Sequence, residues 1–461
     1  MINMKDIFLS IVLIMISLHF LKGQTANLTK RDSILKFEFE GMRIGVAENE
    51  EGPTGTTVFY FPDGVMAAGD IRGGATGTLN SPVVSTGYER KLIDAVVFSG
   101  GSWFGLSAAT GVANEIKNIK AKEGNVDHVP GVLGAIIYDV GDRRFSRTTP
   151  DDQLGKAALN AAMPNWFPLG AKGAGRFAMQ GGYYFNIPRD KGVDSYHLWP
   201  HSGQGGAFAT IGKTKIAVFT VVNALGAIVD RNGKVVRCHR NSTDEDCPFI
   251  ADLIRRSKIG KQLNSKDKDG PTENTTLTLV VTNQKLPFWA LQRMATQVHT
   301  SMGRGIQPFS TQFDGDVLYA VTTGEIDNSD LSPIDLTVAA SELAWDAILN
   351  SVPQLPALPK DTQSVIKLGL FKSYAGIYNF YGGGQLTISD NNNELTAKFK
   401  DNGRIYFDEN KEYRLKPATD GLFIIDAPSK DVIRFNQLRG SSVTTSMTVN
   451  PGPWHIDAIR N

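Results

Sequence analysis

The chain has 461 residues, of which 41% are hydrophobic and 21% are charged, and its formal net charge is +1. This composition is typical of a folded globular protein and excludes a largely disordered chain, and the length predicts two or three domains. Because the net charge is small and no basic stretch is interleaved with aromatic residues, a nucleic-acid partner or a strongly anionic surface is not expected.

The first 23 residues differ from the rest and are predicted to be a secretory signal peptide. Lys5 precedes an almost wholly apolar segment, Ile7 to Leu21, and Lys22-Gly23-Gln24 ends it. The segment is short and ends abruptly, so a cleaved signal is favoured over an uncleaved N-terminal anchor. No cysteine follows it, which argues against a lipoprotein. We therefore expect a secreted or periplasmic protein without a stable membrane anchor.

Residues 36–350 predict an α/β domain, because short buried strands alternate with amphipathic helices. Apolar residues at helical spacing predict one helix around Leu291 to Met302 and another around Leu336 to Ala347. This mixture favours layered α/β architecture over a helical bundle or a β-sandwich. The expected strands are apolar or β-branched and are bounded by turn residues: Thr56 to Phe61, Ala95 to Phe98, Gly134 to Val140, Lys215 to Asn223 and Thr276 to Thr282.

Two glycine-rich segments, Arg72 to Thr78 and Phe98 to Leu106, each follow an apolar stretch. Neither has the glycine spacing and the lysine of a P-loop, and neither is a dinucleotide-binding fingerprint. Ser102 is reminiscent of a serine nucleophile elbow, but Phe104 stands where that motif requires its second glycine. A hydrolase that uses Ser102 is therefore disfavoured. The glycines are expected to let the backbone pack closely or to line a pocket.

A polar side chain, Asn223, stands at the carboxyl end of an expected apolar strand. An amide in such a place can donate a hydrogen bond to an oxyanion that develops during acyl transfer. Asparagine before a glycine-containing turn is also common for purely structural reasons, and Gly226 follows closely. Taken alone, the residue leaves both interpretations open.

The only two cysteines, Cys238 and Cys247, flank a short polar stretch. In an exported protein, a close pair of this kind is predicted to form one disulfide that closes a loop. The spacing matches no zinc pattern, and no histidine cluster completes one. Neither a metal nor a cofactor is therefore expected.

The junction between Asn274 and Thr275 places a hydroxyl residue where a polar loop enters a buried strand. An N-terminal nucleophile requires this geometry, because the preceding peptide must be accessible while the strand holds the new terminus rigidly. A freed α-amine has an unperturbed pKa of about 7.7–8.0 and can act as a base at neutral pH. On this segment alone, a threonine that merely begins a strand is favoured. Asn274-Thr275-Thr276 is also a glycosylation sequon.

Two carboxylates, Asp314 and Asp316, flank Gly315 just before another apolar stretch. They can hold a newly formed amine by charge-assisted hydrogen bonds. An Asp-Gly hairpin turn explains the same residues without a catalytic role. On this segment alone, the hairpin is favoured.

A proline-rich linker, Val352 to Pro359, separates the α/β domain from a β-rich module. Beyond about residue 366, short strands alternate with turn signals such as Asn402-Gly403 and Asp420-Gly421, which predicts a small all-β module. Tyr374 to Tyr378 loosely resembles a segment of the β-rich accessory domains that follow some secreted serine hydrolases. A packing or binding role is expected. The strands are expected around residues 386–388, 395–397, 404–407, 422–425 and 432–435.

Residues from about 41 to 350 resemble the self-processing L-aminopeptidase/D-esterase and β-peptidyl aminopeptidase family. Eight matching stretches in the same order make the resemblance specific, and it reverses the preferences stated for the isolated segments. The stretches are Thr54 to Val58, Asp70 to Thr78, Gly100 to Leu106, Ile136 to Asp139, Gly170 to Gly175, Val222 to Gly226, Asn274 to Leu277 and Phe313 to Asp316.

The resemblance implies a four-layer αββα sandwich like that of the N-terminal nucleophile hydrolases, with different connectivity. It implies self-cleavage between residues 274 and 275 into two chains that stay associated. Thr275 then takes the place of the serine that family members often use as the nucleophile. Asn223 matches the asparagine of the oxyanion hole, and Tyr138 matches a tyrosine that lines the active site. Asp314 and Asp316 match a serine and an acid near the nucleophile, so aspartate replaces the serine here.

The expected organisation is a signal peptide at residues 1–23, a self-processing aminopeptidase domain at 24–352, a linker at 353–365 and an all-β accessory domain at 366–461. The insertion around Cys238 and Cys247, the linker and the β-module lie outside the resemblance. The protein is expected to be a homo-oligomer of processed heterodimers.

The expected function is that of a secreted aminopeptidase or amidase that removes N-terminal residues from small peptides, amides or esters. One alternative is a self-cleaving acyltransferase, which passes the acyl group to an amine instead of water. Another is a secreted binding protein on the same fold that no longer cleaves. The choice among L-residues, D-residues and β-amino acids stays open, because no motif reports the shape of the pocket.

Overall fold

The computed structural model describes residues 34–49, 51–140, 148–182, 201–238, 247–256, 274–327, 331–353, 371–381, 383–392, 394–400, 409–427, 431–438 and 442–461. The expected signal peptide, the linker after residue 353 and the strand expected at 404–407 lie outside these ranges. Within them, no helix combines the length and the apolar composition that a membrane crossing requires.

Strand β3 (Thr54–Ile71) is the longest strand of the α/β domain and belongs to both halves of its sheet. Its first part pairs with β2 and β5, and its second part pairs with β13. Between Tyr60 and Val65 the register is irregular, and Gly64 adopts a φ of 67° there. The other strands of this sheet are β2 (Arg43–Asn49), β4 (Thr78–Leu79), β5 (Ile93–Ser99), β6 (Val132–Ile136), β8 (Gln204–Ile211), β9 (Thr214–Asn223), β11 (Thr275–Gln284) and β13 (Val317–Ile326).

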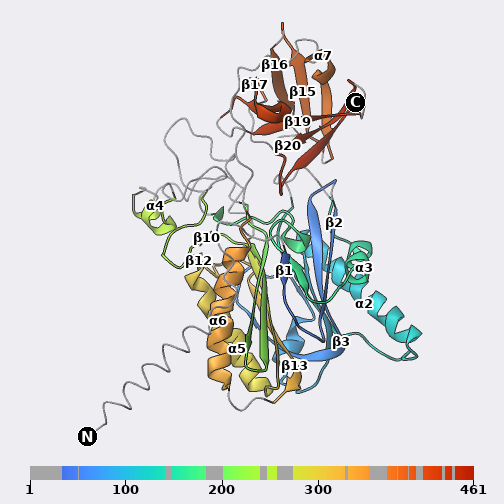
Figure 1. The fold of residues 1–461 in the computed structure, drawn as a ribbon, viewed down its shortest axis with the longest axis vertical. Coiled ribbons are helices and arrows are strands. Elements are labelled where there is room, and N and C mark those ends of the chain that lie inside the picture. Colours follow the sequence, from blue (N-terminus) through green and yellow to red (C-terminus); the bar gives the residue numbers. More distant parts are fainter. Residues whose placement is uncertain are drawn as a thin grey trace.

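Three hydrophobic clusters show that the two halves of this sheet face one another, with helices outside them. The central cluster joins Phe59 and Phe98 of one half to Phe219 and Leu279 of the other. A second cluster packs the outer face of β9, β11 and β13 against α5 (Phe288–Ser301) and α6 (Pro333–Asn350). A third packs β3, β5 and β6 against α2 (Leu106–Lys122) and α3 (Asp152–Asn160). The predicted four-layer αββα sandwich is therefore confirmed, with the helix pairs on opposite sides (Figure 1).

The sequence predicts five of the buried strands and the helices α5 and α6, but it misses α2, β2 and β8 and extends one strand too far. That strand, β6, ends at Ile136 rather than at Val140. Beyond it, Asp139 is buried and accepts hydrogen bonds from the Gly101 N–H at 2.6 Å and from the Thr54 hydroxyl at 2.7 Å. These hydrogen bonds satisfy the buried Asp139 carboxylate where the chain is no longer in a strand. The apolar run of the sequence is therefore longer than the strand itself.

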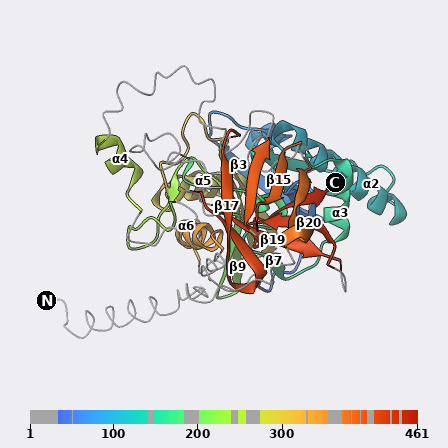
Figure 2. The ribbon, with the colours of Figure 1, turned by 90° about the horizontal axis from the view of Figure 1, so that it is seen from above.

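The C-terminal part is a closed antiparallel barrel of eight strands, preceded by the short helix α7 (Phe371–Tyr374). Its interior is filled by a cluster in which Tyr374 stacks on Phe435 with ring centroids 4.4 Å apart. The prediction of a small all-β domain is confirmed, and the barrel lies over one end of the sandwich (Figures 1 and 2). Its strands are β14 (Gly376–Phe380), β15 (Gln385–Asp390), β16 (Leu395–Lys400), β17 (Glu412–Pro417), β18 (Leu422–Ile425), β19 (Val432–Gln437), β20 (Thr444–Val449) and β21 (Ile456–Arg460).

Shorter elements complete the described chain. The pairs β1 with β7 and β10 with β12 are antiparallel. Their bounds are β1 (Ile34–Lys36), β7 (Trp166–Pro168), β10 (Ala227–Ile228) and β12 (Ile306–Gln307), and a further helix is α4 (Ile250–Arg256).

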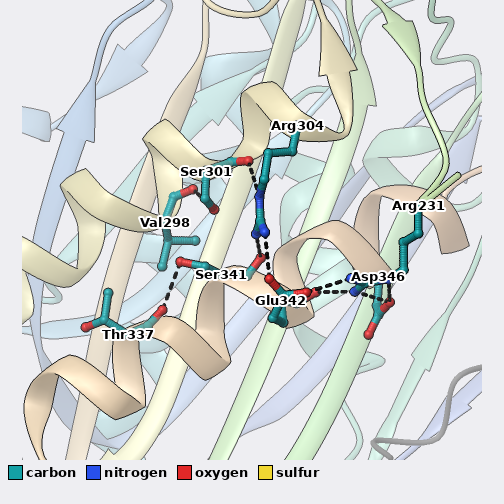
Figure 3. A network of polar contacts seen from close by, with 8 residues as sticks. All are labelled: Arg231, Val298, Ser301, Arg304, Thr337, Ser341, Glu342 and Asp346. Atoms are coloured by element: carbon teal, nitrogen blue, oxygen red, sulfur yellow. Dashed lines mark hydrogen bonds and ion pairs between the residues drawn. The ribbon is translucent and has the colours of Figure 1, made fainter. Parts of the chain in front are cut away.

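A network of charged side chains joins α6 to the segments that follow β10 and α5 (Figure 3). Glu342 accepts hydrogen bonds at 2.6 Å from both Arg231 and Arg304, and Arg231 also reaches Asp346 at 2.8 Å. The two guanidinium groups each lie 4.9 Å from the ring centroid of Trp345. Partial burial raises the pKa of Glu342, but the hydrogen bonds and charges of the two arginines outweigh it, so this pKa is lowered.

Glu342→Gln is expected to lower the free energy of unfolding by about 1 kcal/mol at pH 7, a small value because solvent screens this half-exposed network. Since the folded-state pKa lies below the unfolded value, the stabilisation is present above about pH 4.3 and is lost as the pH falls through the folded value. Urea unfolding at a series of pH values measures this. Glu40→Gln, on an exposed turn before β2, is the control. An equal loss in both variants would contradict the prediction.

Candidate active site

The peptide bond between Asn274 and Thr275 lies where β11 begins, beside the segment that leads into β13. Asn274 forms an isolated parallel bridge with Asp314. Its N–H donates to the Phe313 carbonyl at 3.0 Å, and its carbonyl accepts from the Gly315 N–H at 2.6 Å. Asn274 and Thr275 are both buried. Backbone hydrogen bonds therefore hold the residue before the junction, and the strand holds the residue after it.

The hydroxyl of Thr275 points at the carbonyl that precedes it. Side chains alternate along β11, and Thr275 shares the parity of Leu277 and Leu279, which face the space between the two sheets. Its Oγ1 donates to the Asn274 carbonyl oxygen at 2.6 Å. That oxygen accepts from the Gly315 N–H as well. If the Thr275 Oγ1 attacked the carbonyl carbon, the Gly315 N–H would remain to stabilise the negative charge on this oxygen.

Gly315 is required by the close approach of the backbone at this point. A Cβ there would lie 2.6 Å from the Thr275 Oγ1 and 2.7 Å from the Ala75 carbonyl oxygen. Gly73 is equally confined, because its Cβ would lie 2.2 Å from the Asp314 carbonyl oxygen. The expectation that the segment around Gly73 lets the backbone pack closely is confirmed.

Asp314 and Asp316 are buried, and both accept hydrogen bonds from backbone N–H groups close to the junction. Asp316 accepts hydrogen bonds from the backbone N–H groups of Thr276 at 2.6 Å and Ser310 at 3.0 Å. Asp314 accepts from the Leu225 N–H at 3.2 Å, and from the Thr311 N–H and hydroxyl at 2.9 and 2.6 Å. The hairpin alternative is excluded, since the strand β13 that follows these aspartates pairs with β11 and β3, and Asp314 forms an isolated bridge with Asn274.

The surroundings of Asp314 and Asp316 favour the protonated form of these carboxyl groups. Burial raises the pKa of Asp314. Burial also raises the pKa of Asp316 well above its usual range, and the nearby charge of Asp314 raises it further. The backbone N–H donors oppose both shifts. Two carboxyl groups that repel each other in a buried site can hold and release a proton near the junction.

Asn223 lies directly opposite Thr275 in the antiparallel pairing of β9 with β11. It shares the parity of Val221 and Phe219, so its side chain faces the space between the sheets, as Thr275 does. Its Oδ1 accepts from the Met179 N–H at 3.1 Å, and its Nδ2 donates to the Tyr138 carbonyl at 3.1 Å. The structure thus places the predicted Asn223 opposite Thr275 and in contact with the backbone carbonyl of Tyr138.

Sequence reasoning missed two backbone groups at this site. The Met179 N–H orients Asn223, and the Gly315 N–H binds the carbonyl of the junction. Backbone groups leave no signal in residue identity. The only available hint was a glycine between two aspartates.

The cysteines lie apart from these residues in the sequence and in their contacts. Cys238 and Cys247 form a disulfide, and Cys238 packs with Val229, Val235 and Ile250. In the portions of the chain that are described, no group of three or more His, Cys, Asp or Glu side chains is arranged to hold a metal ion.

Similarity to known proteins covers most of the α/β domain. Residues 192–358 match the model of peptidase family S58. The chain is 37% identical over 332 residues to the 6-aminohexanoate-oligomer endohydrolase of Paenarthrobacter ureafaciens, covering 69% of this chain and 86% of that protein. It is 32% identical over 303 residues to an uncharacterized aminopeptidase of Mycobacterium leprae (strain TN), covering 62% and 75%. Among solved structures, a Burkholderia sp. beta-aminopeptidase aligns with a TM-score of 0.48 at 15% identity, covering 78% of this chain and 94% of that one.

Proposed function

Because this chain belongs to peptidase family S58 and is a hydrolase of peptide or amide bonds, we propose that it cuts itself between Asn274 and Thr275 and then uses Thr275 as an N-terminal nucleophile. One observation carries the proposal. The Thr275 hydroxyl and the Gly315 N–H each donate at 2.6 Å to the carbonyl oxygen of the bond to be cut. A nucleophile, its carbonyl and an oxyanion donor are therefore already assembled in the uncut chain.

Self-cleavage begins when the Thr275 Oγ1 loses its proton and attacks the carbonyl carbon of Asn274. The C–N bond breaks as the Thr275 nitrogen takes a proton, which leaves the acyl group of Asn274 as an ester on Thr275. Water then hydrolyses this ester and yields a carboxylate at Asn274 and a free amine at Thr275. The Gly315 N–H faces the oxygen on which negative charge develops. The Asp314–Asp316 pair is the nearby group that can accept or supply the proton.

In turnover, the freed amine is the proposed base for its own hydroxyl. An unperturbed α-amine has a pKa of about 7.7–8.0, so a useful fraction is unprotonated at neutral pH. The Thr275 Oγ1 attacks the substrate carbonyl, the amine passes the proton to the leaving group, and water releases the acyl group. Asn223, held by Met179 and Tyr138, is the proposed oxyanion donor.

The proposed substrates are small peptides, amides or esters with a free amino terminus, in keeping with the aminopeptidase relative. The name of the Paenarthrobacter relative adds a second class, linear amide oligomers of an amino acid with a long methylene chain. Release of 4-nitroaniline from aminoacyl 4-nitroanilides, compared with hydrolysis of 6-aminohexanoate oligomers, separates the two classes. We further propose that the protein is exported and assembles as an oligomer of cut chains.

Intact-mass spectrometry of the purified protein tests the central proposal. We expect two polypeptides, one ending at Asn274 and one running from Thr275 to Asn461, because the assembled site needs only water to complete the cut. The start of the first polypeptide also tests removal of residues 1–23. A single continuous polypeptide that hydrolyses amides would contradict self-cleavage, and a single inactive one would support a binding protein. Loss of activity in a Ser102→Ala variant that is cut normally would favour a serine hydrolase instead.

A further inference from the structure

A loop of the barrel inserts a tryptophan into the surface of the α/β domain. Trp454 lies between β20 and β21, and only 6% of its surface is exposed. It packs with Ala171 and Phe177 of the α/β domain. Its indole stacks on the imidazole of His201, with ring centroids 4.5 Å apart and planes 15° apart, and Phe177 meets the same imidazole edge-on at 5.2 Å. An aromatic residue at a loop tip is thus buried by the other domain.

Two arginines of the α/β domain hold the same loop. Arg176 is buried, and its Nη1 donates to the Pro453 carbonyl at 2.8 Å. The guanidinium of Arg237 lies 6.0 Å from the ring centroid of Trp454, and its Nη1 donates to the His201 carbonyl at 3.2 Å. A buried guanidinium is unfavourable unless its hydrogen bonds are kept. The contact is therefore a specific interface and not an incidental touch between two domains.

The segment under this loop also orients the proposed oxyanion donor. His201 and Met179 form an antiparallel bridge. The Met179 N–H donates to the Oδ1 of Asn223 at 3.1 Å. Next to it, the Ser202 N–H donates to the Ala178 carbonyl at 3.1 Å. A continuous series of contacts thus leads from the Trp454 ring through His201 and Met179 to the Asn223 side chain.

We propose that the C-terminal barrel is a positioning domain for the hydrolytic site and that Trp454 is its positioning residue. Docking of Trp454 holds the Phe177–Met179 segment, and the Met179 N–H then holds the amide of Asn223 in its productive orientation. The proposal rests on the proposed function, in which Asn223 donates to the substrate oxyanion. It extends that function by giving the barrel a part in catalysis.

Loss of the Trp454 ring should affect the transition state more than substrate binding. A misplacement of about 1 Å in a catalytic group can lower a rate by about a hundredfold, and removal of an oxyanion donor lowers it by about 10²–10³. Loss of Trp454 only loosens the support of Asn223, so the rate should fall by less than either of these amounts. We expect about a tenfold fall in kcat. The KM should change less than about twofold, because an oxyanion donor acts on charge that forms only during the reaction.

The test compares Trp454→Ala with Trp454→Phe in the full-length protein, using the aminoacyl 4-nitroanilide that the wild type hydrolyses fastest. The phenylalanine variant keeps a stacked ring and should keep most of the kcat. Leu438→Ala, which removes an exposed apolar side chain elsewhere on the barrel, is the control and should match the wild type. If the alanine variant folds poorly, Trp454→Leu fills most of the volume without stacking and should show the same fall in kcat.

A double-mutant cycle with Asn223→Ala decides whether Trp454 acts through Asn223. We expect Trp454→Ala to have no further effect on kcat once the Asn223 side chain is absent. The positioning role would be overturned if Trp454→Ala lowered kcat tenfold both in the wild type and in Asn223→Ala, or if it left kcat unchanged. Either result would leave the proposed function intact. A normal kcat in Asn223→Ala itself would instead remove Asn223 from the proposed mechanism, and the positioning role with it.

Discussion

Thr275→Val is expected to yield a single uncut chain that does not hydrolyse amides. Valine keeps the β-branched shape that suits β11 and removes only the hydroxyl. The Asn274 carbonyl still accepts from the Gly315 N–H, so the loss in stability should be limited to about 1 kcal/mol. Without the hydroxyl, neither the self-cleavage nor the turnover has a nucleophile. A denaturing gel, an intact mass and an amidase assay on the same sample measure the outcome.

Thr275→Ser is the matched control, because it keeps the hydroxyl and removes only the methyl group. This variant should be cut and should retain activity. Two fragments from the valine variant, or hydrolysis by its uncut chain, would show that Thr275 is not the nucleophile.

Gly315→Ala is expected to slow self-cleavage by about 10²–10³-fold, the usual effect of losing one oxyanion donor. The new Cβ would stand 2.6 Å from the Thr275 Oγ1, so the hydroxyl or the Gly315 backbone must move. Movement of the backbone weakens the hydrogen bond from the residue 315 N–H to the Asn274 carbonyl, and movement of the hydroxyl displaces the nucleophile. The fraction of uncut chain, followed over time after purification from freshly expressing cells, gives the rate.

Gly303→Ala serves as the control for this substitution. A Cβ at Gly303 would have only the Phe309 Cβ near it, at 4.0 Å, so the variant should be cut at the wild-type rate. Thermal unfolding of both variants separates a local effect from a loss of folding. If Gly315→Ala folds and is cut as fast as the wild type, its amide has no part in the reaction.

The sequence was most informative where side-chain periodicity and burial agree. The apolar runs at β9 and β11 predict buried strands, and alternation along each strand places Asn223 and Thr275 on one face. The sequence could not show that these two strands are neighbours in the register that sets Asn223 opposite Thr275. Only the resemblance to a known family connected them.

The remaining features depend on contacts that residue types do not report. Asp314 and Asp316 were expected to hold a new amine, and in the uncut chain they bind the backbone of Leu225 and Thr276 instead. In the barrel, a strand such as β17 contains several charged residues, and its apolar residues do not alternate regularly with polar ones. It was therefore not predicted as a strand from the sequence. Closure of the barrel and the docking of Trp454 depend on residues far apart in the chain.

The strand order of the sandwich determines what a break at residue 274 would do to the assembly. The strands β13 and β11 lie after the break, and their outer neighbours, β3 and β9, lie before it. The two strands of the later piece therefore lie side by side between two strands of the earlier piece and are hydrogen-bonded to both. Its release would require both flanking ladders to open at once, together with the apolar layers on either side. The two pieces should accordingly copurify and separate only in denaturant.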